Sequence, residues 1–383
     1  MSVPLLLALP WLLVPLVLAW RARDSWSLDA VSVEPPEGPP LLSVVVPARD
    51  ERRNVGRLVR SVLDSTWPQL ELVLVDDGST DGTADEALGA AAGDPRLRIV
   101  ANPPLADGWF GKQWACANGA LAARGSLLLF TDADTDHGPE LHVRAVNALL
   151  ERDADLLTVA GTQEMRSFWE RMVQPQVFQL IAARFGGTRR VNRSTRASDK
   201  IANGQFILVR RETYERLGGH SLVRDTVAED LALAQRWFAA GARTVIVAGE
   251  RHLRTRMYAS LPELVRGWRK NVFAGGRDAM PGGRAGRALF PLLLPLPALL
   301  TMLPVVLLAA ATVAPVPPAL VTFAASAALL HLLAWAFAYL RLGHSPLNAL
   351  GYPLGAAVFL YIVVSATLRG RRVSWKGRDY RHR

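Results

Sequence analysis

Two carboxylates, one residue apart, follow a short apolar run in the first half of the sequence. The run is SLLLFTD at residues 126–132, and Asp132 and Asp134 come at its end. Side chains alternate along a strand, so residues i and i+2 point the same way. Carboxylates that face one spot repel each other unless a cation such as Mg²⁺ or Mn²⁺ binds them, together with substrate phosphates. The pattern predicts a divalent metal at Asp132 and Asp134, and the alternative is a solvated turn.

Acidic residues also follow the first two apolar, β-branched runs. LLSVVV (41–46) precedes PARDE, and ELVLV (71–75) precedes DDGSTDGT. Ligands of parallel sheets bind beyond the carboxyl ends of the strands, so these segments are expected at one edge. Carboxylates there suit the N–H groups and ribose hydroxyls of a nucleoside. The residues expected to bind it are Asp50, Glu51, Asp76 and Asp77. For DDGSTDGT, a capped strand–helix turn is the alternative.

Lys112 supplies positive charge for the same edge. It follows Gly111 at the predicted start of a helix, where an anion is favoured. Together with a metal, this lysine predicts a pocket for a nucleoside diphosphate, although a lone lysine is usually solvated. The sequence contains neither GxxxxGK[ST] nor GxGxxG, so the ATPase and dinucleotide-binding signatures are absent.

The elements that would position these residues alternate along the chain. Helical patterns such as NVGRLVRSVLDS and KQWACANGALAA lie between the apolar runs. This alternation predicts an α/β domain with a mainly parallel sheet that is covered on both faces. The predicted strands are residues 41–46, 71–75, 97–101, 126–132 and 155–161.

Both ends of the chain predict membrane segments. Residues 3–20 are apolar and long enough to span, and the arginines that follow predict an anchor whose C-terminal side is cytoplasmic. Residues 288–313, 318–340 and 347–368 predict three more spans. The basic tail at 369–383 is expected in the cytoplasm, which conflicts with three crossings. We therefore expect one segment not to cross, and the proline-rich first one can be interfacial or re-entrant.

The charge of the chain agrees with a membrane protein. The formal net charge is +10, and the isoelectric point is about 10.4. Much of the positive charge lies in the tail and in residues 184–196 and 251–284, close to the predicted membrane contacts. We expect a membrane partner and no nucleic acid. The single cysteine, Cys116, excludes an intrachain disulfide and is expected to be a small core residue.

Taken together, the motifs resemble those of the family 2 glycosyltransferases with a GT-A fold. The resemblance spans roughly residues 43–240 and rests on VVVPARDE, VDDGSTDGT, GKQWA, FTDADT, NGQFILVRR, GGH and VAEDLALAQR. It implies a nucleotide-sugar-binding α/β domain, here with transmembrane helices at both ends. The membrane layout and the terminal VSWKGRDY look closest to bacterial enzymes that glycosylate carotenoid or other polyisoprenoid lipids.

The resemblance implies roles for individual residues. Asp134 would be the main metal ligand, Asp132 would contact ribose, sugar or metal, and Asp230 would be the general base. Neighbours on a helix diverge by about 100°, so only one of Glu229 and Asp230 is expected to face the pocket. The nucleotide-sugar contacts implied by these motifs are Pro47, Ala48, Asp50, Glu51, Asp76, Asp77, Lys112, Asp132 and Gln205. The residues expected on the acceptor side are His220, Glu229, Trp268 and Arg269, with a structural role as the alternative for His220.

Polymer-forming members of the family carry QxxRW, and this chain departs from that motif. VRGWRKN at 265–271 has Trp268 before Arg269 and no glutamine. The departure favours one sugar addition to one lipid over polymer synthesis. Leu261, Leu264, Val265, Trp268 and Val272 share one helical face beside basic residues. This pattern is typical of an interfacial helix, and an ordinary packed surface helix is the alternative.

The expected organisation follows from these segments. It comprises an anchor (1–23), a linker (24–40), a GT-A catalytic domain (41–250), an interfacial segment (251–287), transmembrane segments (288–368) and a basic cytoplasmic tail (369–383). We expect an inverting transfer from a nucleotide sugar, with UDP as the expected nucleotide, to a hydroxyl or carboxyl of a membrane lipid. The catalytic domain is expected on the cytoplasmic side of the cell membrane. The alternatives are a membrane polysaccharide synthase and a non-catalytic scaffold with the same fold.

Overall fold

The computed structural model describes residues 2–280, 283–369, 372–375 and 378–381 and divides the chain into two compact units. The helical unit comprises Met1–Asp24, Met165–Gly187 and Tyr258–Gly370. The sheet unit comprises Ser25–Glu164, Thr188–Met257 and Arg371–Arg383. The expected catalytic domain at 41–250 is therefore interrupted, because the segment Met165–Gly187, which contains the helix Phe168–Phe185, belongs to the helical unit.

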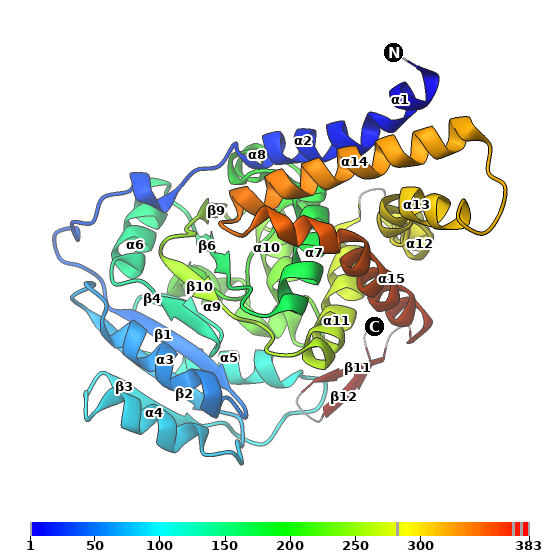
Figure 1. Ribbon diagram of the computed structural model, residues 1–383. Coiled ribbons are helices and arrows are strands. Elements are labelled where there is room, and N and C mark those ends of the chain that lie inside the picture. The colour runs from blue at the N-terminus through cyan, green and yellow to red at the C-terminus, as the bar shows by residue number, and fades with distance from the viewer. Residues whose placement is uncertain (1, 281–282, 370–371, 376–377, 382–383) are drawn as a thin grey trace. The chain divides into compact units, whose positions relative to one another are not determined.

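A seven-stranded sheet organises the sheet unit (Figure 1). Its order is β3 (Leu97–Ala101), β2 (Leu70–Asp76), β1 (Leu42–Ala48), β4 (Leu127–Phe130), β8 (Ile207–Arg210), β6 (Leu156–Ala160) and β9 (Thr244–Ala248). Strand β1 runs parallel to β2 and β4, whereas β8 runs antiparallel to β4 and β6. The mainly parallel sheet is confirmed, and β8 and β9 lie outside the predicted strands.

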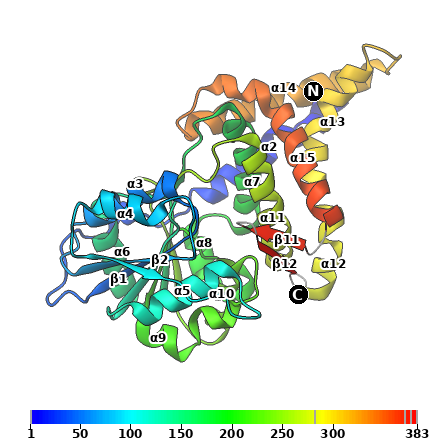
Figure 2. The same ribbon diagram turned by 90° about the horizontal axis from the view of Figure 1, so that it is seen from below.

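Helices cover both faces of this sheet (Figure 2). One face carries α3 (Arg52–Leu63), α4 (Thr83–Ala91) and α6 (Leu141–Glu151), and the other carries α5 (Gly111–Ala122), α9 (Arg211–Arg216) and α10 (Glu229–Ala239). In β1, Val44 packs in the hydrophobic core under α3, α4 and α6, and Val45 packs in the core under α5, α9 and α10. Because both faces of the strand are buried, its sequence is a continuous apolar run. Gly119 lets α5 approach closely, because a Cβ there would lie 2.4 Å from Val45 Cγ1.

Smaller elements complete the sheet unit. A three-stranded sheet has the order β5 (Thr135–His137), β10 (Leu253–Thr255) and β7 (Thr162–Gln163). The remaining elements are α8 (Thr188–Arg193), the 3-10 turns Leu28–Ala30, Ala197–Asp199 and Gly219–Val223, and the strand pair β11 (Arg372–Trp375) and β12 (Arg378–Arg381).

The helical unit contains the apolar ends of the chain. Its helices are α1 (Val3–Ala8), α2 (Pro10–Ala22), α7 (Phe168–Phe185), α11 (Leu261–Ala279), α12 (Gly283–Leu293), α13 (Leu296–Ala310), α14 (Pro318–Arg341) and α15 (Tyr352–Arg369), with a 3-10 turn at Pro346–Gly351. Among the described residues, four helical stretches are long and apolar enough to cross a membrane, namely Val3–Ala22, Ala285–Ala310, Pro318–Arg341 and Pro346–Leu368. They agree with the predicted membrane segments.

Helix α11 packs within the helical unit along its apolar face. Leu264, Trp268 and Val272 are buried, whereas Arg266 is exposed. The indole of Trp268 lies edge-on to Phe178 of α7, with ring centroids 5.7 Å apart. This packing is what the ordinary-helix alternative predicts for this segment, and an interfacial role for α11 stays a prediction.

Candidate functional site

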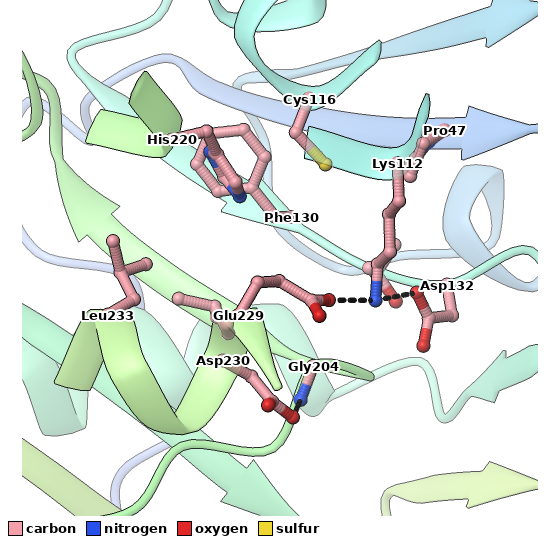
Figure 3. Close-up of a pocket in the computed structure, with 12 residues that line it drawn as sticks. Pro47, Lys112, Cys116, Phe130, Asp132, Gly204, His220, Glu229, Asp230 and Leu233 are labelled. Carbon is pink, nitrogen blue, oxygen red and sulfur yellow. Dashed lines mark hydrogen bonds and ion pairs between the residues drawn. The ribbon is translucent and has the colours of Figure 1, made fainter. Parts of the chain in front are cut away.

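A pocket opens at the carboxyl ends of β1 and β4 in the sheet unit (Figure 3). It is lined by Pro47, Lys112, Cys116, Phe130, Thr131, Asp132, Gly204, Ile207, His220, Glu229, Asp230 and Leu233. Six separate segments contribute: the ends of β1 and β4, α5, the turn before β8, the 3-10 turn at Gly219–Val223 and the start of α10. The parallel topology thus brings residues from the distant VPARDE, GKQ, TDADT, NGQ and AED motifs to one place.

Lys112 is the charged centre of the pocket. Its ammonium lies 2.8 Å from Asp132 Oδ1 and 2.7 Å from Glu229 Oε1, as the dashed lines in Figure 3 mark. Burial alone would lower the pKa of Lys112, but the two carboxylates outweigh it and raise the pKa well above the ordinary lysine value. Lys112 is therefore a permanent cation that links the TDADT turn to the start of α10.

Asp132 and Asp134 lie on a turn and not on a strand. Strand β4 ends at Phe130, earlier than predicted, and β5 begins at Thr135. Asp132 meets Lys112, whereas Asp134 Oδ1 is buried without a hydrogen-bond partner among the described residues. Burial, Asp132 and Glu51 raise the pKa of Asp134 to about 8. A buried acceptor without a donor, beside a second carboxylate, fits a divalent cation.

The protein supplies few ligands for such a cation. Among the described residues, no group of three or more His, Cys, Asp or Glu side chains is arranged to hold a metal ion. Mg²⁺ commonly binds through one or two carboxylates and completes its shell with water and substrate phosphates. Asp134 and Asp132 fit that mode, in which a phosphate substrate supplies further oxygens.

Asp230 is held by backbone donors at the first turn of α10. Its Oδ2 accepts a hydrogen bond from the Gly204 N–H at 2.9 Å, and its Oδ1 accepts one from the Leu231 N–H at 2.7 Å. Burial, followed by the charge of Glu229, raises the pKa of Asp230 to about 6. A carboxylate with this pKa ionises at neutral pH and can still accept a proton from a bound hydroxyl.

Glu229 and Asp230 both line the pocket, so the expectation that only one of them faces it is wrong (Figure 3). Helix α10 begins at Glu229, where the longer glutamate side chain reaches Lys112 while Asp230 turns to Gly204. A Cβ on Gly204 would lie 3.1 Å from Lys112 Nζ and 3.2 Å from Asp230 Oδ2. The absence of a side chain at Gly204 therefore makes room for both groups.

The loops after β1 and β2 are joined by the residues predicted to bind the nucleoside. Asp50 has a left-handed backbone (φ 51°), and its Oδ1 accepts a hydrogen bond from the Thr80 N–H at 2.9 Å. Ser79 donates its N–H to Asp76 Oδ1 at 3.1 Å, and its hydroxyl oxygen accepts from the Asp50 N–H at 3.0 Å. These bonds shape the edge, and the nucleoside contacts stay predictions.

Asp77 and Glu51 have protein partners on the same edge. Asp77 is buried and accepts a hydrogen bond from Asn102 Nδ2 at 2.8 Å, and Glu51 accepts one from Asn54 Nδ2 at 2.9 Å. The buried Ala48 carbonyl accepts from the Asp77 N–H at 2.8 Å. These three residues therefore have a structural task, whatever else they bind.

Gln205 and His220 are both buried and hydrogen-bonded. Gln205 Oε1 accepts from Gln163 Nε2 at 2.8 Å. His220 Nδ1 lies 2.9 Å from the Tyr214 hydroxyl, and its ring meets Phe130 edge-on at 4.5 Å. Burial lowers the pKa of His220 to about 4, so it is neutral at pH 7. These contacts are what the structural alternative for His220 predicts.

Four predicted or overlooked residues need separate mention. Trp268 and Arg269 lie on α11 in the helical unit, and their acceptor role stays a prediction. Cys116 lines the pocket, and burial raises its thiol pKa far above the ordinary value, so the thiol stays protonated. Gly204 is missing from the predicted site residues, although it stands beside Gln205 in the NGQ motif.

Comparison with known proteins gives consistent results. Residues 43–218 match the model of the family described as glycosyl transferase family 2. Over 247 residues the chain is 28% identical to the 4,4'-diaponeurosporenoate glycosyltransferase of Staphylococcus aureus strain MRSA252. It is 27% identical to the protein of the same description from strain USA300. Each alignment covers 63% of this chain and 63% of the relative, so the chain matches less than two thirds of the relatives' length.

A solved structure shares the fold over nearly the whole chain. It is a mannosyltransferase from Pyrobaculum calidifontis in complex with GDP-Man and Mn²⁺. The TM-score is 0.60 at 21% identity, and the match covers 95% of this chain and 97% of that chain. At this identity the similarity concerns the fold alone.

Proposed function

We propose that the protein transfers a sugar from a nucleotide sugar to an isoprenoid lipid acceptor of the carotenoid type. Residues 43–218 match the glycosyl transferase family 2 model, and the fold is that of a mannosyltransferase structure, which supports the proposal. The observation that carries the proposal is the pocket at the strand ends. It contains a fixed cation, Lys112, and the carboxylate of Asp230. The turn that supplies its Asp132 also carries Asp134, a carboxylate of different character. The names of the Staphylococcus relatives supply the acceptor class.

The donor half of the proposed site consists of Lys112, Asp132 and Asp134. Asp134, with Asp132, would hold a Mg²⁺ or Mn²⁺ ion, which neutralises the diphosphate and stabilises it as a leaving group. Lys112 adds a second positive charge beside the same phosphates. We propose a UDP-sugar as donor, and the GDP-Man in the Pyrobaculum enzyme makes GDP-sugars the first alternative to test.

The acceptor half of the proposed site centres on Asp230. An acceptor hydroxyl attacks the anomeric carbon, the bond from that carbon to the diphosphate oxygen breaks, and Asp230 takes the hydroxyl proton. One displacement of this kind inverts the anomeric carbon. A carboxylic acid acceptor is already ionised at pH 7, so Asp230 would have no proton to remove from it. The dependence on Asp230 therefore distinguishes a hydroxyl acceptor from a carboxylate acceptor.

The apolar helices support a membrane setting for this reaction. We propose a multi-pass protein of the cell membrane with the sheet unit on the cytoplasmic side. Arg21 and Arg23, which follow the first apolar stretch, and the basic residues at 369–383 support this orientation by the positive-inside rule. Both lie on the cytoplasmic side only if one of the three C-terminal apolar stretches does not cross the membrane.

The test uses full-length protein purified in detergent. UDP-glucose, GDP-mannose and other nucleotide sugars are offered with Mn²⁺, Mg²⁺ or EDTA, together with a carotenoid carboxylic acid or a carotenoid alcohol, and nucleotide release and lipid products are measured. We expect metal-dependent release that rises with one acceptor and is lost in Asp134→Asn but kept in Asp85→Asn, an exposed residue of α4. Folded protein that glycosylates no lipid from any donor would contradict the proposal.

A further inference from the structure

A buried chain of hydrogen bonds lies behind the turn between β4 and β5. It runs through Ser65, His142, His137, Thr131 and Thr135, and both histidines are buried. His137 ends β5 and His142 lies in α6, so they meet from different elements. Neither histidine lines the pocket, and neither belongs to the motifs that indicate the family.

The distances define an unbroken path. His142 Nδ1 lies 2.8 Å from Ser65 Oγ, and His142 Nε2 lies 3.0 Å from His137 Nδ1. His137 Nε2 lies 3.1 Å from the hydroxyl oxygens of both Thr131 and Thr135. Every ring nitrogen of the two histidines therefore has a partner.

The two threonines determine the direction of the path. Thr131 donates its hydroxyl proton to the Gln205 carbonyl at 2.7 Å, and Thr135 donates its own to the Asp132 carbonyl at 2.8 Å. A carbonyl only accepts and a hydroxyl has one proton, so His137 Nε2 must be the donor toward both threonines. If His137 Nε2 accepted a proton instead, one threonine would have to donate its only hydroxyl proton to the ring, and its hydrogen bond to the backbone carbonyl would be lost.

The remaining protons follow from this donor. A neutral imidazole carries one N–H, so His137 Nδ1 accepts from His142 Nε2–H, and His142 Nδ1 accepts from the Ser65 hydroxyl. Ser65 Oγ in turn accepts from the Trp67 N–H at 3.1 Å. Burial lowers the pKa of both histidines, that of His142 to about 3, which keeps both rings neutral.

The path ends on both halves of the pocket. The Asp132 carbonyl belongs to the turn that carries the carboxylates of Asp132 and Asp134. The Gln205 carbonyl belongs to the turn whose Gly204 N–H holds Asp230 at 2.9 Å. In the contacts described above, the His137 ring alone contacts both Thr131, which is bonded to the Gln205 carbonyl, and Thr135, which is bonded to the Asp132 carbonyl.

Helix α3 supports the same turn from one face. Arg57 donates to the Asp134 carbonyl at 2.9 Å, and four residues later the Ser61 hydroxyl oxygen accepts from the His137 N–H at 3.1 Å. Ser65 follows after four more residues, just beyond the helix end. Residues four apart lie on one side of a helix, so α3 presents Arg57 to the Asp134 carbonyl and Ser61 to the His137 N–H, and Ser65 continues this row to His142.

We propose that His137 is a positioning residue that holds the 131–135 turn and the 203–205 turn in a fixed arrangement through its Nε2 proton, while His142 and Ser65 set its tautomer. The effects expected of this arrangement, on metal binding at Asp134 and on proton transfer at Asp230, rest on the proposed function. The tautomer of His137 follows from the hydrogen bonds alone and is independent of the proposed function.

The first test is ¹⁵N NMR of the full-length protein in detergent, labelled at histidine, at pH 7 and without metal. Signals are assigned by their loss in His137→Asn and His142→Asn. We expect both rings to be neutral with the proton on Nε2. A proton on Nδ1 of either ring, or a doubly protonated ring, would overturn the proposal.

The second test measures Mn²⁺ binding directly, by electron paramagnetic resonance of free Mn²⁺ in the presence of UDP. Thr135→Val keeps the side-chain shape but removes the donor to the Asp132 carbonyl. Loss of groups that orient metal ligands weakens metal binding by about 10- to 100-fold, and we expect this for Thr135→Val and His137→Leu. Thr135→Ser, which keeps the hydroxyl, should bind like the wild type.

Thr213→Val is the matched control, because the buried Thr213 hydroxyl donates to Asp155 and makes no contact with the turn. It should match Thr135→Val in melting temperature and leave Mn²⁺ binding unchanged. Wild-type Mn²⁺ affinity in folded Thr135→Val would overturn the proposal. If Asp134→Asn also binds Mn²⁺ normally, the metal assignment of the proposed function has failed, and the tautomers then decide the His137 proposal.

Discussion

Asp230 in the pocket and Asp134 on the turn beside it are both half-buried carboxylates, and the structure treats them in opposite ways. Asp230 accepts two backbone N–H groups, and its pKa is about 6. Asp134 Oδ1 has no donor among the described residues, and the pKa of Asp134 is about 8. Burial raises both values, whereas hydrogen bonds to the charged form lower them. The comparison suggests that one side is prepared for a cation and the other for a proton.

Exchanging each carboxylate for an amide tests this division most strongly. Asp230→Asn should lower kcat for a hydroxyl acceptor by about 10²- to 10⁴-fold, the usual contribution of a general base. It should leave Mn²⁺ and UDP binding unchanged. Asp134→Asn should lose Mn²⁺ binding, measured by the same resonance assay. Loss of Mn²⁺ binding in Asp230→Asn, or its retention in Asp134→Asn, would remove the distinction between the two sides.

Replacing Lys112 tests the charge that the two sides share. Lys112→Met keeps most of the length but leaves Asp132 and Glu229 facing each other without their cation. A hydrogen bond to a charged group contributes about 1.5–3 kcal/mol, so we expect the donor KM to rise by about 10- to 100-fold. Lys112→Arg, which keeps the charge, is the control. An unchanged donor KM in Lys112→Met would place the diphosphate elsewhere.

The pH profile tests the proton side alone. Asp230 must be ionised to act as a base, so transfer to a hydroxyl acceptor should fall as the pH drops through about 6, the raised pKa of this group. Below that value the rate should fall about tenfold per pH unit. UDP binding, measured in the same buffers, separates loss of the base from loss of donor. A profile that is flat from pH 5 to 8 would contradict the assignment of Asp230.

Adding one methyl group between the two sides gives the smallest expected effect. In Gly204→Ala, the new Cβ at 3.1 Å from Lys112 Nζ and 3.2 Å from Asp230 Oδ2 must displace one of them by a few tenths of an ångström. A misplacement of 1 Å costs about 100-fold, so kcat should fall by about 3- to 10-fold.

Gly89→Ala on α4 is the control, since a Cβ there meets nothing within 4 Å. It should leave kcat unchanged and stabilise the protein by up to about 1 kcal/mol, from helix propensity. Equal kcat values for the wild type and Gly204→Ala would show that the backbone around residue 204 shifts to fit the methyl group, without displacing Lys112 or Asp230.

Much of the sheet unit was readable from local patterns. Continuous apolar runs such as 41–46 and 71–75 must be buried on both faces, and β1 and β2 are buried in this way. The acidic residues that follow them were expected at one edge because parallel strands end together. The four apolar helices were likewise readable from composition over the length of a span.

Other features had no local signal. The end of β4 at Phe130, which places Asp132 and Asp134 on a turn, depends on pairing with β1 and β8. The joint presence of Glu229 and Asp230 in one pocket depends on Gly204 and Lys112, which are distant in sequence. The same holds for the grouping of α7 with the helical unit.

The sequence by itself determined which residue types stand at the ends of the strands, and with them the match to the glycosyl transferase family 2 model and the expected chemistry. Only the tertiary structure decided the state of those residues. It gave Asp230 two donors, left Asp134 Oδ1 without one, and placed His137 against two threonines from the same turn. The physical reason is that burial and hydrogen-bond partners set a pKa or a tautomer, and those partners come from segments that only folding brings together.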